Sequence, residues 1–556
     1  MKTIINLNNK NFFIYFILLI FCTIGYGQKP TVKFNNKISK QLPYNKINNT
    51  FILNADQTYF KGGSFIIRTA SDYRYLTVKD VVPRDKSIVY MWQFVDNRDN
   101  QQLWELIPTA NEYYKIRSAS GFYLSQKRLL APTVEVGANE DSQLWKLEDS
   151  GDGFYYIVSK TNRYMGVTGL RNGNGRLVGF GSSSQNKTTF KWHLIKWKND
   201  GRKQTAFNPA TQGFKFANTF GGVDASRRYG GLCAGMIYST LDYYNAGMNI
   251  PTQNYRPANR TVLQSYLYKR QNNSSFESNL DKWIELRGDA LGTRNSEFFS
   301  WGLRGYNGGR LQELRTAIDS HKSVPIGLYV GQAKGLDGFE TGDHQVLGIG
   351  YAVGRYTGDM KKNKGDLKIF VYDPNHPNKT MTLVPDLINE CYLEVESGTC
   401  WRTYFVDNKY SPNQPPVIQS LPYNEADGHI RHLYATFATG GDDLRGGNDN
   451  VSLTINYKDG TNQTFNNVNL GARWIDNYEE TVPLILNRTI SKSDIASFTI
   501  STNFGGGIGG DNWNLDKFFV SNGGNIIIVC ANCEESDRMP MVRFTGSIHE
   551  KNVIVH

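Results

Sequence analysis

The stretch GGLCAGMIYSTLDYY, from Gly230 to Tyr244, combines a helix pattern with a single cysteine. Its apolar residues recur at helical spacing after two glycines, and Gly247 is placed to end the helix. Cys233 therefore falls in the first turn, where free N–H groups and the helix dipole stabilise an anion. The pattern predicts a helix buried along one side, with a thiolate nucleophile at its N-terminus.

A thiolate nucleophile needs a proton partner and a group that orients this partner. His344 opens the apolar strand HQVLGIGYAVG, and the following strand LKIFVYDP contains Asp373 at its end. If the two strands are antiparallel neighbours, the end of the second lies beside the start of the first. The Asp373 carboxylate then fixes the tautomer of the imidazole and stabilises the imidazolium. The predicted catalytic residues are Cys233, His344 and Asp373, with Asn375 as the alternative orienting residue.

The order of helix cysteine, strand-opening histidine and strand-ending aspartate resembles the papain-like cysteine peptidases, over about Phe220 to Asp407. The pattern DHQVLGIGY…VYDP is most similar to the papain-fold peptidases that cut bacteriocin leader peptides. The resemblance implies that Cys233 is the nucleophile, His344 the general base and acid, and Asp373 the orienting residue. Arg227 stands where the family carries a glutamine that helps to form the oxyanion hole. Arg227 is therefore a candidate second donor beside the backbone N–H of Cys233.

A threefold repeat precedes this region, between residues 61 and 198. Each unit spans about forty residues, begins with a short alternating strand and ends in a tryptophan: Trp104, Trp145 or Trp192. Units of this size cannot bury a core alone, so we expect them to close around a pseudo-threefold axis. The Gln-x-Trp pattern at Gln102 and Gln143 resembles the ricin-type β-trefoil lectins, which implies carbohydrate binding. The family's sugar-binding Asp and Asn positions hold other residues here, so a sugar-binding trefoil and a purely structural trefoil are both open.

The N-terminus has the pattern of an export signal. Lys2 and Lys10 precede the short apolar run FFIYFILLIFCTIG, and small residues follow up to Gly27. No later stretch is long and apolar enough to cross a bilayer. We therefore expect a secreted protein, extracellular or at the cell surface, in a compartment where disulfides persist.

Cysteine spacing agrees with such a compartment. Six cysteines are present, one of them within the signal segment. Cys391 and Cys400 could staple a short hairpin, while Cys530 and Cys533 form CANC, either a local disulfide or half of a metal site. If both local pairs close, Cys233 is the thiol left over.

Composition changes along the chain predict several domains: a β region, an α+β region and a second β region. Together with the resemblances, this implies a β-trefoil, then an α+β papain-like fold, then an all-β sandwich. In the middle region helical patterns come first and alternating strands later, and SPNQPP marks a linker. The last region resembles accessory β-sandwich modules of secreted bacterial hydrolases. The expected segments are a signal peptide (1–27), an N-terminal extension (28–60), the ricin-type β-trefoil (61–198), the papain-like domain (199–410), a linker (411–429) and the β-sandwich (430–556).

Charge and loop composition bear on possible partners. The formal net charge is +11, but the basic residues are scattered and no nucleic-acid-binding motif accompanies them, which argues against a nucleic-acid partner. Asp442, Asp443 and Asp511 lie in loops rich in Gly, Asp and Asn that could bind Ca²⁺, although such residues are also ordinary turn formers. The predicted chemistry requires no cofactor.

Two main functional hypotheses follow. The first is a secreted cysteine peptidase, or a related thiol acyl-enzyme amide hydrolase, that acts on protein or peptide substrates and carries β modules for targeting. The second is a carbohydrate-binding adhesin or lectin that contains an inactive papain-like scaffold. A glycoside hydrolase ranks last, since it needs two carboxylates across a cleft, which the sequence does not show.

Overall fold

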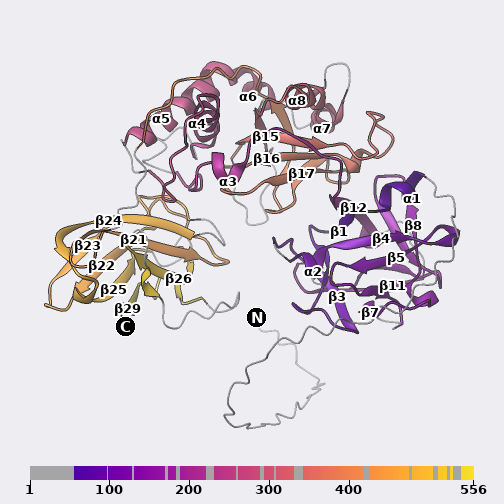
Figure 1. The fold of residues 1–556 in the computed structure, drawn as a ribbon, viewed down its shortest axis with the longest axis horizontal. Helices are drawn as coiled ribbons and strands as arrows, with labels where there is room; N and C mark the ends of the chain where they lie inside the picture. Colours follow the sequence, from indigo (N-terminus) through magenta and orange to yellow (C-terminus); the bar gives the residue numbers. More distant parts are fainter. Residues whose placement is uncertain are drawn as a thin grey trace, which may run out of the picture. The chain divides into compact units, whose positions relative to one another are not determined.

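The protein, described here as a computed structural model, is mostly β with several sheets, and most helices lie in its middle part (Figure 1). Among the described residues, no helix has the length and apolar character needed to cross a membrane. The signal segment, most of the expected extension, Arg227 and the CANC pair lie outside the described residues. The structure describes residues 55–96, 98–127, 131–168, 173–182, 188–220, 231–257, 261–287, 294–305, 309–330, 342–418, 425–474, 479–504, 511–522, 526–529 and 540–555.

The first sheet has twelve strands and closes on itself like a barrel. Its strands are β1 (Ser64–Thr69), β2 (Tyr75–Val78), β3 (Ser87–Trp92), β4 (Trp104–Pro108), β5 (Tyr113–Ser118), β6 (Tyr123–Ser125), β7 (Thr133–Glu135), β8 (Trp145–Asp149), β9 (Tyr155–Ser159), β10 (Tyr164–Thr168), β11 (Arg176–Gly181) and β12 (Lys191–Lys198), with the helices α1 (Ala55–Phe60) and α2 (Asp99–Gln102) beside them. The order is β10-β11-β3-β2-β1-β12-β9-β8-β5-β6-β7, and β4 pairs with β1 and β5. Additional pairings of β10 with β9 and of β3 with β7 join parts of the sheet that are distant in this order.

The three repeat tryptophans are core residues of this sheet, each with 0% of its surface exposed. Each indole Nε1 donates a hydrogen bond to a main-chain carbonyl of an earlier strand in its own unit: Trp104 to Leu76 (2.9 Å), Trp145 to Leu124 (3.0 Å) and Trp192 to Met165 (2.9 Å). A buried indole needs such a partner, because an unpaired N–H is costly in an apolar core. The sequence repeat is therefore also a repeat of structure.

The second sheet has eight strands and carries the residues predicted to be catalytic, apart from the helix cysteine. Its strands are β13 (Lys203–Gln204), β14 (Val324–Tyr329), β15 (His344–Ala352), β16 (Lys368–Tyr372), β17 (Met381–Asp386), β18 (Cys391–Glu394), β19 (Cys400–Trp401) and β20 (Thr403–Val406), and the helices before it are α3 (Pro209–Gln212), α4 (Cys233–Asn245), α5 (Val262–Asn272), α6 (Leu280–Arg287), α7 (Asn295–Leu303) and α8 (Arg310–Asp319). The order is β19-β18-β17-β16-β15-β14-β20, with β13 paired to β15. All of these pairings are antiparallel.

Helices cover both faces of this second sheet. Ile237 and Leu241 of α4 share an apolar cluster with Leu347 of β15. Leu311 of α8 belongs to a different cluster, together with Val346 of the same strand. Because neighbouring residues of a strand point to opposite faces, α4 and α8 lie on opposite sides of the sheet.

Two further antiparallel sheets follow in the last part of the chain. Their strands are β21 (Ile430–Thr439), β22 (Val451–Tyr457), β23 (Asn462–Phe465), β24 (Glu479–Ile490), β25 (Ile495–Thr502), β26 (Trp513–Ser521), β27 (Ile526–Val529), β28 (Val542–Phe544) and β29 (Glu550–Ile554). One sheet has the order β24-β21-β26-β27 with β28 paired to β26, and the other has the order β23-β22-β25-β29. Phe437 and Phe518 of the first and Leu453 and Phe498 of the second share one buried cluster, so the two sheets have a common core.

Two expected segment boundaries differ in the structure. Residues 55–60 were expected in the N-terminal extension, yet they form α1, and Phe60 is buried in the core of the first sheet. The start of the expected linker at residues 411–429 is packed rather than free. The carbonyl of Ser411 accepts a hydrogen bond from Arg270 of α5 (2.8 Å), and that of Pro416 accepts one from Tyr243 of α4 (2.7 Å). Both corrections come from long-range contacts that local composition does not encode.

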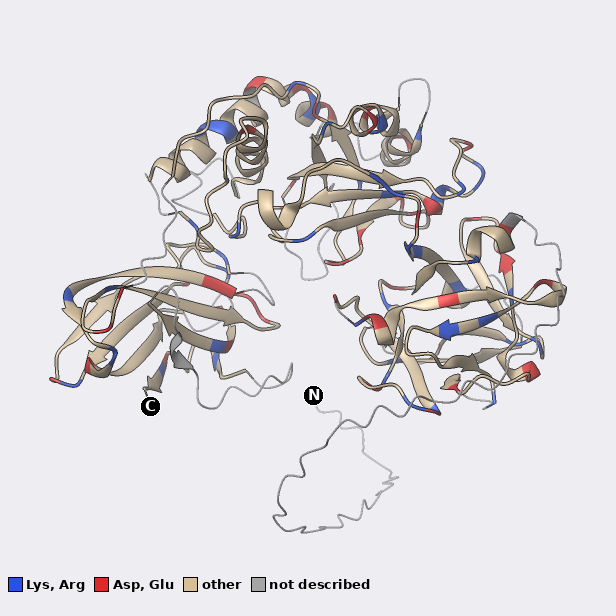
Figure 2. Cartoon of the chain, viewed as in Figure 1, with Lys and Arg blue, Asp and Glu red and all other residues tan. Residues whose placement is uncertain are grey.

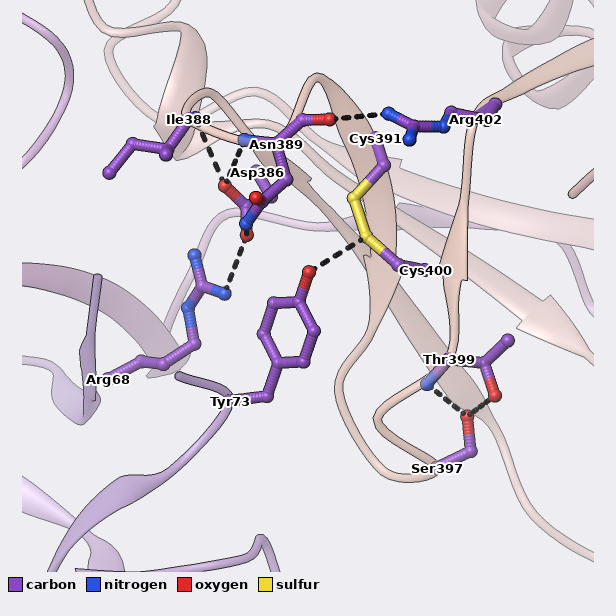
Figure 3. Close-up of a disulfide and its surroundings, with 10 residues drawn as sticks. All are labelled: Arg68, Tyr73, Asp386, Ile388, Asn389, Cys391, Ser397, Thr399, Cys400 and Arg402. Atoms are coloured by element: carbon purple, nitrogen blue, oxygen red, sulfur yellow. Dashed lines mark hydrogen bonds and ion pairs between the residues drawn. A yellow bond between two sulfur atoms is a disulfide. The ribbon is translucent and has the colours of Figure 1, made fainter. Parts of the chain in front are cut away.

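A buried ion pair joins the first sheet to the second. Arg68 of β1 donates to Asp386 at the end of β17 over 3.0 Å, and both side chains are almost completely buried (Figure 3). An apolar cluster surrounds this junction and contains Ile66 from the first sheet with Val384 and Leu393 from the second. The pair is therefore shielded from water. In such a buried environment, the loss of one partner leaves the charge of the other uncompensated.

We expect Arg68→Met to lower the free energy of unfolding by about 3–5 kcal/mol, because Asp386 then has no counter-charge. Thermal unfolding of the full chain measures the change. Arg294→Met is the matched control: Arg294 pairs with Glu297 at an exposed site, where loss of the pair should cost about 1 kcal/mol or less. Equal effects of the two substitutions would contradict a buried junction.

Candidate active site

The start of α4 places Cys233 at the edge of the second sheet. The thiol is half-buried, and Cys233 is the free cysteine among the described residues. At Gly235 a Cβ atom would lie 2.1 Å from the carbonyl oxygen of Leu267 in α5, so only glycine permits this close packing of the two helices. The Gly235 N–H donates to the Gln271 side chain over 2.8 Å. The first turn of α4 is thus fixed against α5, while its free N–H groups lie beside the thiol.

His344 and Asp373 meet through strand pairing. His344 is the first residue of β15, Asp373 directly follows β16, and the register pairs Leu347 with Tyr372. The imidazole Nε2 lies 2.6 Å from Asp373 Oδ1. Only 4% of His344 and 1% of Asp373 is exposed, so the contact is dry. The antiparallel arrangement expected from the sequence is present.

Cys233 lies close enough to His344 for its side chain to act on the imidazole. Burial lowers the pKa of His344, but the Asp373 carboxylate and the Cys233 side chain outweigh it, so this pKa is raised well above its ordinary value. Burial raises the pKa of Asp373, and the neighbouring imidazole outweighs this effect, so the pKa of Asp373 is lowered. The arrangement favours an imidazolium between a carboxylate and a sulfur.

Trp401 packs against His344 and was not identified from the sequence. Its ring is stacked on that of His344, with centroids 5.7 Å apart and an angle of 19° between the planes. It directly follows Cys400, which forms the predicted disulfide with Cys391 and thereby closes the β18–β19 hairpin (Figure 3). Tyr73 of the first sheet donates a hydrogen bond to Cys400 Sγ over 3.3 Å. In the sequence, the only signal for this contact was that Trp401 directly follows the cysteine predicted to staple the hairpin.

Asn375, the alternative orienting residue, supports Asp373 through its backbone. Its N–H donates to Asp373 Oδ1 over 2.7 Å, while its side-chain Oδ1 accepts from Asn218 over 3.2 Å. Asn218 Oδ1 in turn accepts from the N–H of Leu232, just before the cysteine, over 2.7 Å. Asn218, which carries no motif in the sequence, thus connects the start of α4 to the turn after Asp373.

The three aspartates considered for Ca²⁺ are engaged in separate ion pairs: Asp442 with Arg543 (2.7 Å), Asp443 with Arg473, and Asp511 with Arg445 (2.8 Å). Among the described residues, a different group has metal-ligating geometry, namely Asp373, His376 and Glu394. Burial and the nearby Asp373 raise the pKa of Glu394 well above its ordinary value.

Figure 2 shows basic and acidic residues interspersed over the described elements.

The first sheet also contains a pocket of about 370 Å³, lined mainly by polar groups. Glu105 and Arg117 face each other at its wall, joined by a hydrogen bond of 3.0 Å from Arg117 Nε to Glu105 Oε2. Ser64, Ser118 and Ser120 complete the polar lining. This combination can form hydrogen bonds to a ligand rich in hydroxyl groups.

No protein-family model matches the chain, and no curated protein matches it. Among solved structures, the designed threefold-symmetric protein ThreeFoil matches 24% of this chain and 99% of its own, with 22% identity and a TM-score of 0.23. The C-half of an earthworm R-type lectin in complex with GalNAc matches 24% of this chain and 99% of its own, with 14% identity and a TM-score of 0.21. An exo-β-1,3-galactanase from Clostridium thermocellum matches 24% of this chain and 30% of its own, with 22% identity and a TM-score of 0.22. These likenesses are too partial to assign a fold or an activity to the whole chain.

We expect Asp373→Asn to lower the pKa of His344, because a neutral amide no longer stabilises the imidazolium. NMR titration of histidine-labelled protein measures this pKa, with the exposed His321 as internal reference. Since folding raises the pKa of His344, its stabilising contribution is complete below about pH 6.5 and is lost as the pH rises through the folded value. An unchanged His344 titration in the variant would contradict the pairing.

Proposed function

We propose that the chain is a secreted thiol-dependent amide hydrolase of the papain-like type that cleaves peptide bonds. The observation that supports this proposal best is the buried imidazole of His344, which is hydrogen-bonded to the Asp373 carboxylate and lies close to the Cys233 side chain. Nucleophilic catalysis by cysteine requires this order of groups: a nucleophile, a base within hydrogen-bond reach, and a third group that orients the base.

In the proposed reaction, the Cys233 sulfur attacks the carbonyl carbon of the substrate amide and forms an S–C bond. The tetrahedral intermediate collapses as the C–N bond breaks, and the imidazolium of His344 gives its proton to the leaving amine. A thioester is left on Cys233. His344 then accepts a proton from water as the water oxygen attacks the thioester, and cleavage of the S–C bond releases the acid and restores the thiolate.

The oxyanion of each intermediate needs hydrogen-bond donors near the sulfur. The backbone N–H of Cys233 is one such donor, since the first N–H groups of a helix have no intrahelical acceptor. Arg227, which lies outside the described residues, stays the predicted second donor. We further propose that the closed first sheet is a β-trefoil and that the two C-terminal sheets form a sandwich, both serving to target the enzyme.

A peptide library derived from a digested proteome tests this function, with new peptide ends identified by mass spectrometry. Wild-type protein should generate cleavage products, and Cys233→Ala should reduce the rate by roughly 10⁴-fold or more. His321→Asn is the matched control, because this histidine lies exposed on the same domain and its left-handed backbone suits asparagine. Products that persist at the wild-type rate in Cys233→Ala would overturn the proposal.

A second function is supported by a separate observation, the polar pocket of the first sheet. We propose that this pocket binds a glycan through Glu105, Arg117 and its serine hydroxyls.

On a glycan array the full chain should bind a defined set of saccharides. Arg117→Ala should weaken this binding about tenfold or more, as expected for loss of a charged hydrogen-bond donor. The control Arg84→Ala, at a highly exposed position, should leave it unchanged. Glycan binding that is unchanged in Arg117→Ala would show that this pocket is not the glycan-binding site.

A further inference from the structure

Glu394 of β18 is a buried carboxyl group that the proposed reaction does not use. It is 1% exposed. Its Oε2 accepts a hydrogen bond from the Ser397 hydroxyl over 2.5 Å, and within the described part of the chain its Oε1 has no hydrogen-bond partner. A buried carboxylate with one neutral partner is costly, so the position calls for a further neutralising group.

Two other ligating side chains converge on Glu394. One ligand atom each of Asp373, His376 and Glu394 can be chosen so that all lie within 4.8 Å of one another. The DPNH turn brings the first two together, since the N–H of His376 donates to the Asp373 carbonyl over 3.0 Å. The imidazole of His344 and the Asn375 N–H both contact Oδ1 of the Asp373 carboxylate.

The charges of this cluster do not balance without an additional cation or proton. Asp373 faces the imidazole of His344, and Glu394 adds a second carboxyl group to the same buried space. Like charges at such a distance cannot both persist in a dry environment. A metal ion would neutralise Glu394 and would also use the unpartnered oxygen atom.

We propose that Asp373, His376 and Glu394 form a binding site for a divalent transition metal ion of the zinc type. One imidazole nitrogen and two carboxylate oxygens match the donors that Zn²⁺ accepts, with the fourth position open to water. Tetrahedral bonds of about 2.1 Å separate ligand atoms by roughly 3.4 Å, so binding draws the side chains inward. His376 is half-buried, and this provides the route from solvent.

The disulfide helps to hold this site together. Cys391 and Cys400 close the hairpin that carries Glu394, and the hairpin is further joined by the Glu394 N–H, which donates to the Thr399 carbonyl over 2.8 Å. The same hairpin places Trp401 against His344. A metal ion on Asp373 would compete with His344 for one carboxylate. If the chain cleaves peptides as proposed, zinc bound at this site would inhibit the cleavage.

Zinc titration of the full chain, without reductant and against a chromogenic chelator, tests the site. The protein carries Cys233→Ser, so that the catalytic thiol cannot act as a ligand. We expect one Zn²⁺ equivalent whose affinity falls at least about tenfold on adding either Glu394→Gln or His376→Asn. Glu550→Gln is the matched control: it makes the same change at an exposed glutamate of β29, outside the cluster, and should bind like the parent.

Two results would overturn the metal site: no zinc binding by the parent, or equal binding by the parent and both ligand variants. If the parent binds no zinc, the Glu394 carboxyl group is neutralised by a proton instead of a metal ion. His376→Asn keeps the test valid if Glu394→Gln fails to fold. Zinc inhibition of peptide cleavage is measured separately, on protein that retains Cys233. If that protein cleaves no peptide, the proposed function fails, while the titration still decides the site.

Discussion

The buried contact between His344 and Asp373 is the constraint on which the rest of the site depends. A charged pair in a dry environment is stable only when its geometry is held and its remaining hydrogen bonds are satisfied. The register of β15 with β16 sets the 2.6 Å contact, and a slip of one residue would turn His344 to the opposite face. The Asn375 N–H supplies a further hydrogen bond to Asp373. Cys233 then needs only a rigid helix start beside the imidazole, which the α4–α5 packing provides.

The β18–β19 hairpin links this pair to the first sheet. Its disulfide, between Cys391 and Cys400, lies next to Trp401, which covers His344. Tyr73 contacts Cys400 from the first sheet, and the adjacent Arg68–Asp386 pair buries a charge at the same junction (Figure 3). The first sheet is thus in direct contact with the part of the second sheet that shapes the site. The contact between the two sheets would thereby help to hold Trp401 and His344 in place.

The predicted triad could be placed from sequence because each member marks the end of a regular element. The histidine and the aspartate at adjoining strand ends become neighbours through strand pairing. The cysteine at the helix start joins them because α4 packs on β15. Trp401, Asn218 and Glu394 were missed, since their roles depend on a hairpin fold and on contacts between distant segments. The three aspartates considered for Ca²⁺ each pair with an arginine that is distant in the chain, and local loop composition does not reveal these partners.

The most direct test of the central claim is the rate of Cys233 alkylation by iodoacetamide across a range of pH, followed by peptide mass spectrometry of the folded, oxidised protein. The account predicts that the folded protein is modified rapidly and selectively at Cys233, and that His344→Ala loses this rapid modification. Alkylation of Cys233 that follows an ordinary thiol, or that needs unfolding, would contradict a working thiolate–imidazolium pair. The protein would then be a binding protein with a structural cysteine.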